Sequence, residues 1–179
     1  MVNDIGDSKV MKSIEDIAEP YRGLVTRLLK VLLSMFGDRL VSFIVYGSVA
    51  RGEAKRSSDL DLLMVVEGLP GSRFDRNKIF DAIEDSLAKD LEDLHALGYY
   101  AALSPIIKTP EEAQKILPLY LDMVEDAVIV YDKNEFFESI LIKLSKKLKE
   151  LGAERVWIGN KWYWRLKKDL KPGEEIIIE

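Results

Sequence analysis

The feature that most constrains this chain is the segment 46–66, YGSVARGEAKRSSDLDLLMVV, in which a Gly-Ser pair and an Asp-Leu-Asp triplet separate two apolar runs. The first run covers 40–46, is rich in β-branched residues and predicts a buried strand. The second run covers 59–66 and predicts another strand, which is apolar on both faces past its two aspartates. Buried strands must be covered by other elements, so we expect an α/β (α+β) fold in which helices flank a small sheet.

Asp59 and Asp61 are two residues apart, so a strand places their carboxylates on the same face. Two adjacent carboxylates repel each other unless a positive charge lies between them. The usual counter-charge is a hard divalent cation such as Mg²⁺, which prefers carboxylate oxygens, water and substrate phosphates. The aspartate pair therefore predicts a metal site with Asp59 and Asp61 as its ligands.

The Gly47-Ser48 pair predicts the other half of a site. Gly47 lets the backbone approach a ligand closely, and Ser48 offers both a hydroxyl and a backbone N–H. A helix that begins here would direct its free N–H groups toward an anion. A phosphate cradle followed by metal-holding carboxylates is an arrangement that suits a nucleoside triphosphate.

The combined pattern is hydrophobic-Gly-Ser, ten residues, then Asp-hydrophobic-Asp-hydrophobic. It resembles the signature of the DNA polymerase beta-like nucleotidyltransferase superfamily. The stretch GSVARGEAKRSSDLDL, residues 47–62, is closest to the minimal nucleotidyltransferase (MNT) type. Either half alone is a weak signal, but both halves at this spacing, each at the end of an apolar run, form a strong one. The resemblance is specific over 40–66 and extends more loosely to Tyr131. It implies the nucleotidyltransferase fold, in which helices flank a small mixed sheet.

The resemblance implies Mg²⁺-dependent transfer of a nucleoside monophosphate from an NTP to an acceptor hydroxyl on a protein partner, an RNA end or a small molecule. In MNT-type proteins the acceptor is often a partner protein, typically a HEPN-type ribonuclease toxin. Asp59 and Asp61 would be the catalytic residues as well as the metal ligands. The residues that would bind the nucleotide and its phosphates are Gly47, Ser48, Arg51 and Ser58.

The chain departs from the resembled family at the next strand, expected over 99–108, which holds no Asp or Glu. Active members usually carry a third carboxylate there, and Ser104 stands near its expected place. Asp126, at the mouth of a later strand, is a candidate stand-in. The departure keeps open a second hypothesis, an MNT-like antitoxin or nucleotide-binding subunit with little turnover that acts by protein–protein interaction. A third hypothesis, a purely structural module, predicts no nucleotide binding.

Periodicity and turn residues predict the remaining elements and the domain organisation. Helices are predicted over 13–19, 20–36, 49–53, 73–96, 109–118, 119–125 and 135–151, and further strands over 99–108, 127–131, 156–158 and 162–166. We expect a nucleotidyltransferase domain over 1–132, with its core at 20–131. A C-terminal extension over 133–179 would contain a helix and a Trp-rich hairpin.

The three tryptophans, Trp157, Trp162 and Trp164, all fall in the predicted hairpin. Alternation along a hairpin explains them as residues that pack on the core or at a homodimer contact. The alternative is a surface for base stacking or partner docking, helped by the neighbouring Lys and Arg residues.

Composition narrows the classes of function. At 179 residues, with a net charge of −5, 47% hydrophobic and 32% charged residues, the chain is typical of a globular domain. The negative charge argues against a general nucleic-acid binder, although an RNA end could still be a local acceptor. The absence of cysteine excludes disulfides, thiolate catalysis and zinc–thiolate sites. No apolar run approaches membrane-spanning length and no signal-peptide core is visible, so we expect a cytoplasmic protein without a membrane partner.

Overall fold

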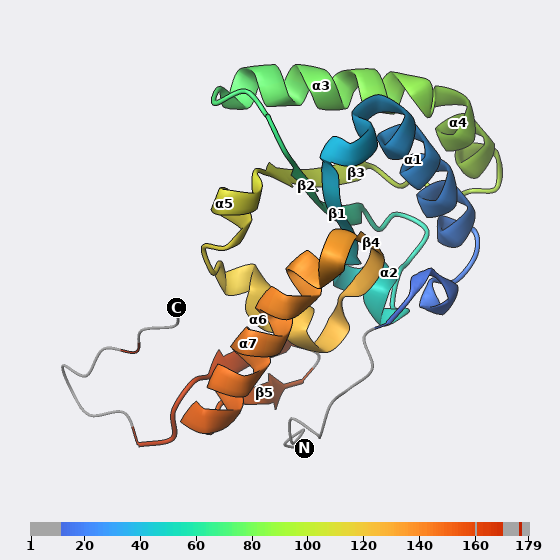
Figure 1. Ribbon diagram of the computed structural model, residues 1–179. Coiled ribbons are helices and arrows are strands. Elements are labelled where there is room, and N and C mark those ends of the chain that lie inside the picture. Colours follow the sequence, from blue (N-terminus) through green and yellow to red (C-terminus); the bar gives the residue numbers. More distant parts are fainter. Residues whose placement is uncertain (1–11, 160, 170–175, 177–179) are drawn as a thin grey trace.

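A four-stranded mixed sheet with helices on both faces forms the body of the molecule, and a two-stranded sheet follows it (Figure 1). The structure is a computed structural model that describes residues 12–159, 161–169 and 176. This architecture confirms the predicted fold class. The end of the predicted extension, 170–179 apart from Ile176, lies outside the described residues.

The helices and strands have the following bounds. The larger sheet consists of β1 (Leu40–Tyr46), β2 (Leu60–Val66), β3 (Leu103–Lys108) and β4 (Val128–Asp132). The α-helices are α1 (Tyr21–Phe36), α2 (Gly47–Arg51), α3 (Arg73–Ser86), α4 (Ala88–Ala96), α5 (Pro110–Ala113), α6 (Pro118–Asp126) and α7 (Phe136–Leu151). Short 3-10 turns are η1 (Ile14–Asp16), η2 (Gly37–Arg39) and η3 (Lys133–Glu135), and the hairpin consists of β5 (Glu154–Ile158) and β6 (Lys161–Arg165).

The strand order of the larger sheet is β3-β2-β1-β4. The central strand β1 runs antiparallel to both β2 and β4, whereas β3 runs parallel to β2. The residues of β1 from Leu40 to Val45 are all buried, as the continuous apolar run predicted. Strand β3 lies at the edge of the sheet. Pro105 is tolerated there because no further strand on the open side needs an N–H from it.

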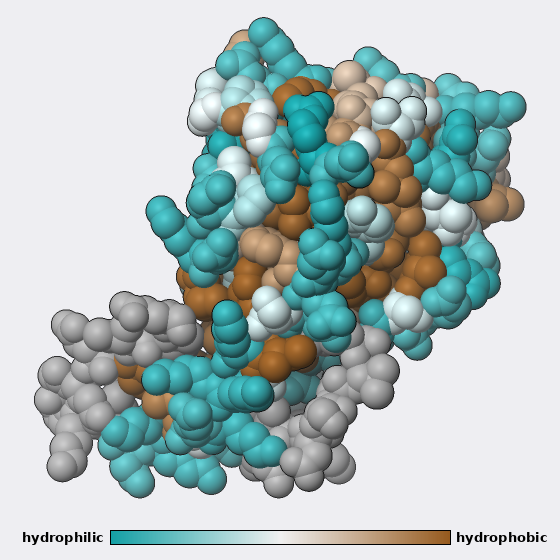
Figure 2. Space-filling view, in the orientation of Figure 1, coloured by the Kyte–Doolittle hydropathy of each residue, from teal (hydrophilic) through white to brown (hydrophobic). Residues whose placement is uncertain are grey.

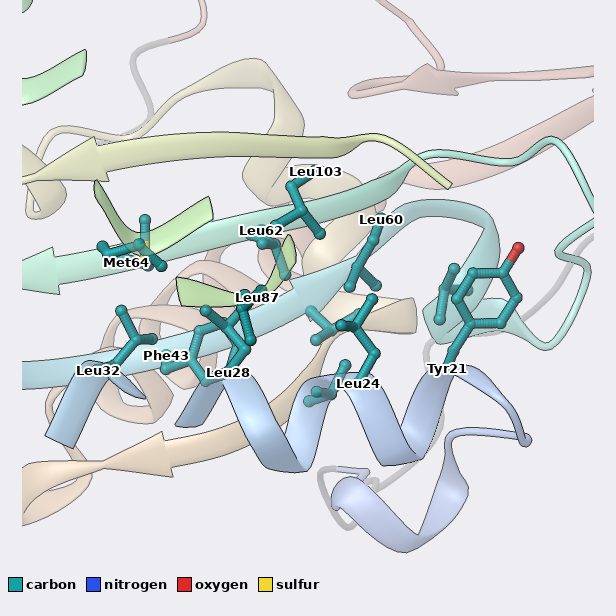
Figure 3. Packing of buried hydrophobic residues seen from close by; sticks show 14 of the residues in the cluster. Tyr21, Leu24, Leu28, Leu32, Phe43, Leu60, Leu62, Met64, Leu87 and Leu103 are labelled. Carbon is teal, nitrogen blue, oxygen red and sulfur yellow. The ribbon is translucent and has the colours of Figure 1, made fainter. Parts of the chain in front are cut away.

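Two apolar clusters cover the two faces of the sheet. On one face Leu60 and Leu62 of β2 pack against α1, α3 and α4, and Figure 3 shows the leucines of α1 directed toward these strands. On the other face Leu63 and Val65 of β2 pack against α6 and α7. Hydrophilic residues cover most of the face shown in Figure 2, with hydrophobic residues visible between them near its centre. The strand that carries the aspartate pair is therefore buried on both faces past Asp61.

The helix predicted over 73–96 is interrupted at Leu87, so this prediction was wrong in detail. Leu87 is fully buried in the cluster beneath α1 and leaves the helical conformation, with φ −105° and ψ 4°. The Ser86 hydroxyl donates a hydrogen bond to the Ala82 carbonyl at 2.9 Å, a contact that often bends helices. The bend between α3 and α4 coincides with the burial of Leu87.

Three other predicted elements are shorter than expected. The strand predicted over 99–108 begins only at β3, because the Tyr100 N–H donates instead to the Arg56 carbonyl at 2.6 Å. The helices predicted over 13–19 and 109–118 are reduced to η1 and α5. The backbone is already extended at Ile17, with φ −81° and ψ 126°, and Leu117 is extended before Pro118, with φ −106° and ψ 152°.

The C-terminal elements follow their predicted order. The helix predicted over 135–151 is confirmed as α7, whose Phe137 and Leu141 are fully buried in the second cluster. The hairpin is confirmed as β5 and β6. The boundary between a domain at 1–132 and an extension at 133–179 stays a prediction. In the described part of the chain, no helix is long and apolar enough to cross a membrane.

Asp132 links β4 to β1 and to the start of α7. The buried Ser42 hydroxyl donates to Asp132 Oδ1 at 2.6 Å. The backbone N–H groups of Phe137 and Glu138 donate to the same carboxylate at 3.1 and 2.9 Å. One carboxylate thus satisfies a buried hydroxyl and two otherwise unpaired N–H groups of a helix N-terminus.

Replacing Asp132 with alanine should lower the free energy of unfolding by about 2–4 kcal/mol, because a helix cap is lost and a buried hydroxyl loses its acceptor. Urea unfolding at pH 7 would measure the change. The matched control is Asp81→Ala on the exposed side of α3, which should change stability by no more than about 0.5 kcal/mol. Equal losses in the two variants would contradict a role for the Asp132 contacts.

Candidate active site

The end of β1 and the start of β2 meet at the Gly-Ser turn. The antiparallel register pairs Tyr46 with Asp61, so Gly47 follows directly beside this aspartate. Gly47 has φ +72°, a conformation that favours glycine, and α2 starts here rather than at 49 as predicted. A Cβ atom added to Gly47 would overlap Asp61 Oδ2 and would lie 3.0 Å from its Cγ. This close approach joins the two halves of the predicted site.

Asp59 and Asp61 lie where β2 begins. The apolar residues at the start of β2 enter the cluster beneath α1, and Asp61 lies on the opposite face, half-buried. Asp59 precedes the strand and is exposed. Burial first, and then the charge of Asp59, raise the pKa of Asp61, whereas Arg51 and a hydrogen bond with Ser104 lower it. Burial and the neighbouring carboxylate therefore outweigh the effects of Arg51 and Ser104 at Asp61.

A hydroxyl lies beside Asp61 on the strand where the sequence resemblance implies a third carboxylate. Strand β3 runs parallel to β2 with Ser104 in register with Asp61, and Ser104 is among the groups that lower the pKa of Asp61. Asp126 does not replace the missing carboxylate, since it is 8% exposed and pairs with Arg155 at 3.1 Å. Among the residues that the structure describes, no three His, Cys, Asp or Glu side chains are grouped to hold a metal ion.

The donors that are present fit a hard divalent cation. Asp59 and Asp61 supply carboxylate oxygens, Ser104 lies beside them with a hydroxyl, and the chain has no cysteine to favour a softer metal. Burial and then the charge of Asp59 raise the pKa of Asp61, and a bound cation would offset both effects. Mg²⁺ is commonly held by one or two carboxylates together with water and substrate phosphates, so two protein carboxylates suffice for binding.

Arg51 is the basic residue of the predicted set, and it ends α2. Its charge acts on Asp61, whose pKa it lowers. Its Nε donates to Glu53 at 2.8 Å, and its Nη1 lies 3.9 Å from Asp126 Oδ2, beyond hydrogen-bond distance. The guanidinium also lies over the ring of Trp162, 4.7 Å from the ring centroid. Because α2 has only five residues, this arginine and individual N–H groups would attract phosphate more than the helix dipole would.

The two predicted serines occupy different positions. Ser48 lies in the first turn of α2 and is partly buried. The Ser58 hydroxyl accepts a hydrogen bond from the Lys55 N–H at 2.8 Å, and the Lys55 carbonyl accepts one from the Tyr21 hydroxyl at 2.8 Å. Ser58 therefore shapes the loop that leads into β2. Direct contact of Ser48 or Ser58 with a nucleotide stays a prediction.

Sequence reasoning missed two residues at this site. Tyr46 is opposite Asp61, and burial, together with the charge of Asp61, raises its pKa to about 12. Its position as the last strand residue before the turn could have indicated this, because antiparallel pairing brings it to the aspartates. Trp162 reaches Arg51 from the C-terminal hairpin, and no local sequence pattern indicates such a contact.

Comparison with known proteins identifies relatives. A family model described as a nucleotidyltransferase domain matches residues 25–136. A protein of Methanocaldococcus jannaschii, named as a candidate protein adenylyltransferase, is 32% identical over 133 residues, which cover 73% of this chain and 84% of that protein.

Solved structures with a related arrangement have lower identity. A structure from Sulfolobus solfataricus, named as a candidate nucleotidyltransferase, is 21% identical, with a TM-score of 0.38, and the match covers 73% of this chain and 95% of that one. The complex of a tri-AMPylated HEPN toxin with an MNT antitoxin from Shewanella oneidensis contains a chain that is 12% identical, with a TM-score of 0.40. That match covers 72% of this chain and 86% of the other.

The contact of Gly47 with Asp61 can be tested with two alanine substitutions. Gly47→Ala should lower the affinity for Mg²⁺ by on the order of tenfold or more, because the new methyl group displaces the Asp61 carboxylate. The control is Gly52→Ala, which has a similar φ of +74° but no atom within 4 Å of the added Cβ. In a calorimetric titration with Mg²⁺, the control should bind with the affinity of the wild type. A matching loss in both variants would assign the effect to backbone strain alone.

Asp61→Asn should stabilise the fold at neutral pH. Because the folded pKa of Asp61 lies above its unfolded value, the folded chain keeps a proton that the unfolded chain releases, and stability falls as pH rises through this interval. Asparagine avoids that cost, and we expect Tm to rise by about 2–4 °C, the effect of ~1 kcal/mol in a domain of this size. The gain should disappear below pH 3.8, the ordinary pKa of the group.

Calorimetric melts between pH 3 and pH 8, spanning about the range in which carboxylates titrate, would measure this difference. Asp81→Asn, at an exposed position on α3, is the control and should give no pH-dependent gain. A lower Tm for Asp61→Asn at pH 7 would contradict the prediction.

Proposed function

The chain belongs to the nucleotidyltransferase domain family, and from this membership we propose that it transfers AMP from Mg²⁺-bound ATP to a hydroxyl group of a protein partner. One observation carries the proposal: Gly47 approaches Asp61 so closely that the turn and the acidic pair can contact one ligand. The name of the Methanocaldococcus relative supports an adenylyl group and a protein acceptor.

Members of the family generally use a divalent metal ion, and we propose Mg²⁺ with Asp59 and Asp61 as its protein ligands. When bound, the ion supplies positive charge that favours deprotonation of the acceptor hydroxyl and departure of pyrophosphate. Gly47 leaves room for the triphosphate to approach the backbone, and Ser48 offers an N–H and a hydroxyl to its oxygens. Catalysis would then consist mainly of positioning and charge compensation.

Arg51 would complete the phosphate site. It is the cation whose charge lowers the pKa of Asp61, and it would place positive charge beside the negative oxygens of the nucleotide. Ser58 would act less directly, by holding the loop that precedes the aspartates.

A second candidate function is supported by Ser104. A hydroxyl stands in register with Asp61 where active relatives of the resembled type carry a carboxylate. With two carboxylates, the site still suits binding of a metal–nucleotide complex, while activation of the acceptor is weakened. The second candidate is therefore an MNT-like antitoxin or nucleotide-binding subunit with little turnover, which acts by protein–protein interaction.

Several details of the proposal stay predictions. A HEPN-type ribonuclease is the partner that the sequence resemblance implies and is the first acceptor to test. An RNA end or a small molecule as acceptor, a homodimer and a cytoplasmic location also stay predictions.

The first experiment is a calorimetric titration of the chain with ATP, GTP, CTP and UTP, each with Mg²⁺. We expect ATP to bind tightest, and the binding should vanish when Mg²⁺ is chelated. The double variant Asp59→Asn/Asp61→Asn should lower affinity and pyrophosphate release by on the order of 10²-fold or more, because both proposed metal ligands lose their charge. Asp81→Asn is the control and should bind ATP as the wild type does.

Pyrophosphate release with a HEPN-type partner present separates the two candidate functions. Release that adds AMP to the partner, and that fails with the double variant, would establish the transferase. Tight binding without release would favour the nucleotide-binding subunit. A wild-type chain that binds none of the four nucleotides would refute both.

A further inference from the structure

Trp162 connects the C-terminal hairpin to the candidate active site. Its ring centroid lies 4.7 Å from the guanidinium carbon of Arg51 and 5.0 Å from that of Arg155. The hairpin register pairs Trp157 with Trp162 and Arg155 with Trp164, so these side chains share one face of the hairpin. Trp157 packs on the same ring, with centroids 4.9 Å apart. The ring is therefore engaged by protein groups rather than left open for base stacking.

Two aspartates of α6 fix the hairpin in place. The Nε1 groups of Trp162 and Trp164 donate to Asp122 Oδ1 at 2.8 and 2.9 Å. Arg155 pairs with the same oxygen at 3.3 Å and with Asp126 Oδ2 at 3.1 Å, and its side chain is only 8% exposed. Moving the hairpin would leave buried charges without partners, which is costly, so the Trp162 ring is held firmly.

Three groups surround the guanidinium of Arg51. Glu53 accepts a hydrogen bond from its Nε, Asp126 Oδ2 lies 3.9 Å from its Nη1, and the Trp162 ring centroid lies 4.7 Å from its central carbon. The side chain is 20% exposed, although a long arginine side chain can sample many rotamers when nothing holds it. Fixing a binding group before its ligand arrives removes an ordering cost from binding.

We propose that Trp162 is a positioning residue that holds the Arg51 guanidinium beside the acidic pair, ready to meet the phosphates of the bound nucleotide. The inference rests on the proposed function, because it takes Arg51 as a phosphate-binding residue. It gives the hairpin a part in the nucleotide site, although the hairpin lies outside residues 25–136 that the family model matches.

The test compares substitutions at Trp162 by calorimetric titration with Mg²⁺-ATP. Trp162→Leu removes the π-face and should weaken binding by about three- to tenfold, the range expected for a partly buried cation–π contact. Trp162→Phe keeps an aromatic face over Arg51 and should retain most of the affinity. The control is Tyr163→Leu, on the opposite face of the hairpin and 47% exposed, which should leave affinity unchanged.

A double-mutant cycle with Arg51→Gln distinguishes positioning from a general structural effect. If Trp162 acts through Arg51, Trp162→Leu should cause no further loss in the Arg51→Gln background. Equal losses in both backgrounds, or no loss from Trp162→Leu while the wild type binds, would overturn the inference and leave the proposed function standing. A wild type that binds no Mg²⁺-nucleotide would overturn both.

A measurement on the wild type covers the case in which Trp162→Leu fails to fold. All three tryptophans lie in the hairpin, so intrinsic tryptophan fluorescence reports on that element alone. Saturation with Mg²⁺-ATP should change the emission. Binding of the phosphates to the Arg51 guanidinium would alter the charge next to the Trp162 ring. Unchanged emission at saturation, confirmed as saturation by calorimetry, would contradict the coupling.

Discussion

The antiparallel register of β1 and β2 is the constraint on which the site depends. It pairs Tyr46 with Asp61 and so places Gly47 against the carboxylate. A slip of one residue would turn Asp61 into the apolar cluster beneath α1 and would expose leucines in its place. Because both faces of β2 are buried past Asp61, the hydrophobic pattern that builds the sheet also fixes the geometry of the site. The close approach then requires glycine at 47, since any side chain would displace the carboxylate.

The site is also where the fold works against its own stability. Asp61 is half-buried next to Asp59, and the pKa values of both Asp61 and Tyr46 are raised by burial. Elsewhere in the sheet, the buried Ser42 hydroxyl has a partner in Asp132. An acidic pair that is only partly compensated, at the start of a well-packed strand, is the kind of local conflict that marks a functional site, because a charged ligand can relieve it.

The sequence predicted the parts of the fold that rest on local patterns. Strand β1 and helix α7 were predicted almost to the residue, because an uninterrupted apolar run and a strict helical period each end at a clear stop signal. The break at Leu87 could not be seen, since both halves of 73–96 share one helical period and the bend depends on burial against α1. The sequence placed Ser104 only near the position opposite Asp61, because the register of two parallel strands depends on the topology of the sheet rather than on a local pattern. Whether the predicted site residues bind nucleotide rests on experiment.

Contacts between distant segments could not be predicted, and Asp126 shows why this matters. Its place in the sequence suggested a third metal ligand, yet the structure pairs it with Arg155 at 3.1 Å. The same carboxylate lies 3.9 Å from Arg51, too far for a hydrogen bond, so Arg155 takes the direct contact with Asp126. The hairpin thus supplies both Arg155, which pairs with Asp126, and the Trp162 ring, which contacts Arg51. The Nε–H of Arg51 donates to Glu53, whereas its Nη1 makes no direct hydrogen bond to Asp126, so this end of the guanidinium can donate to a phosphate oxygen.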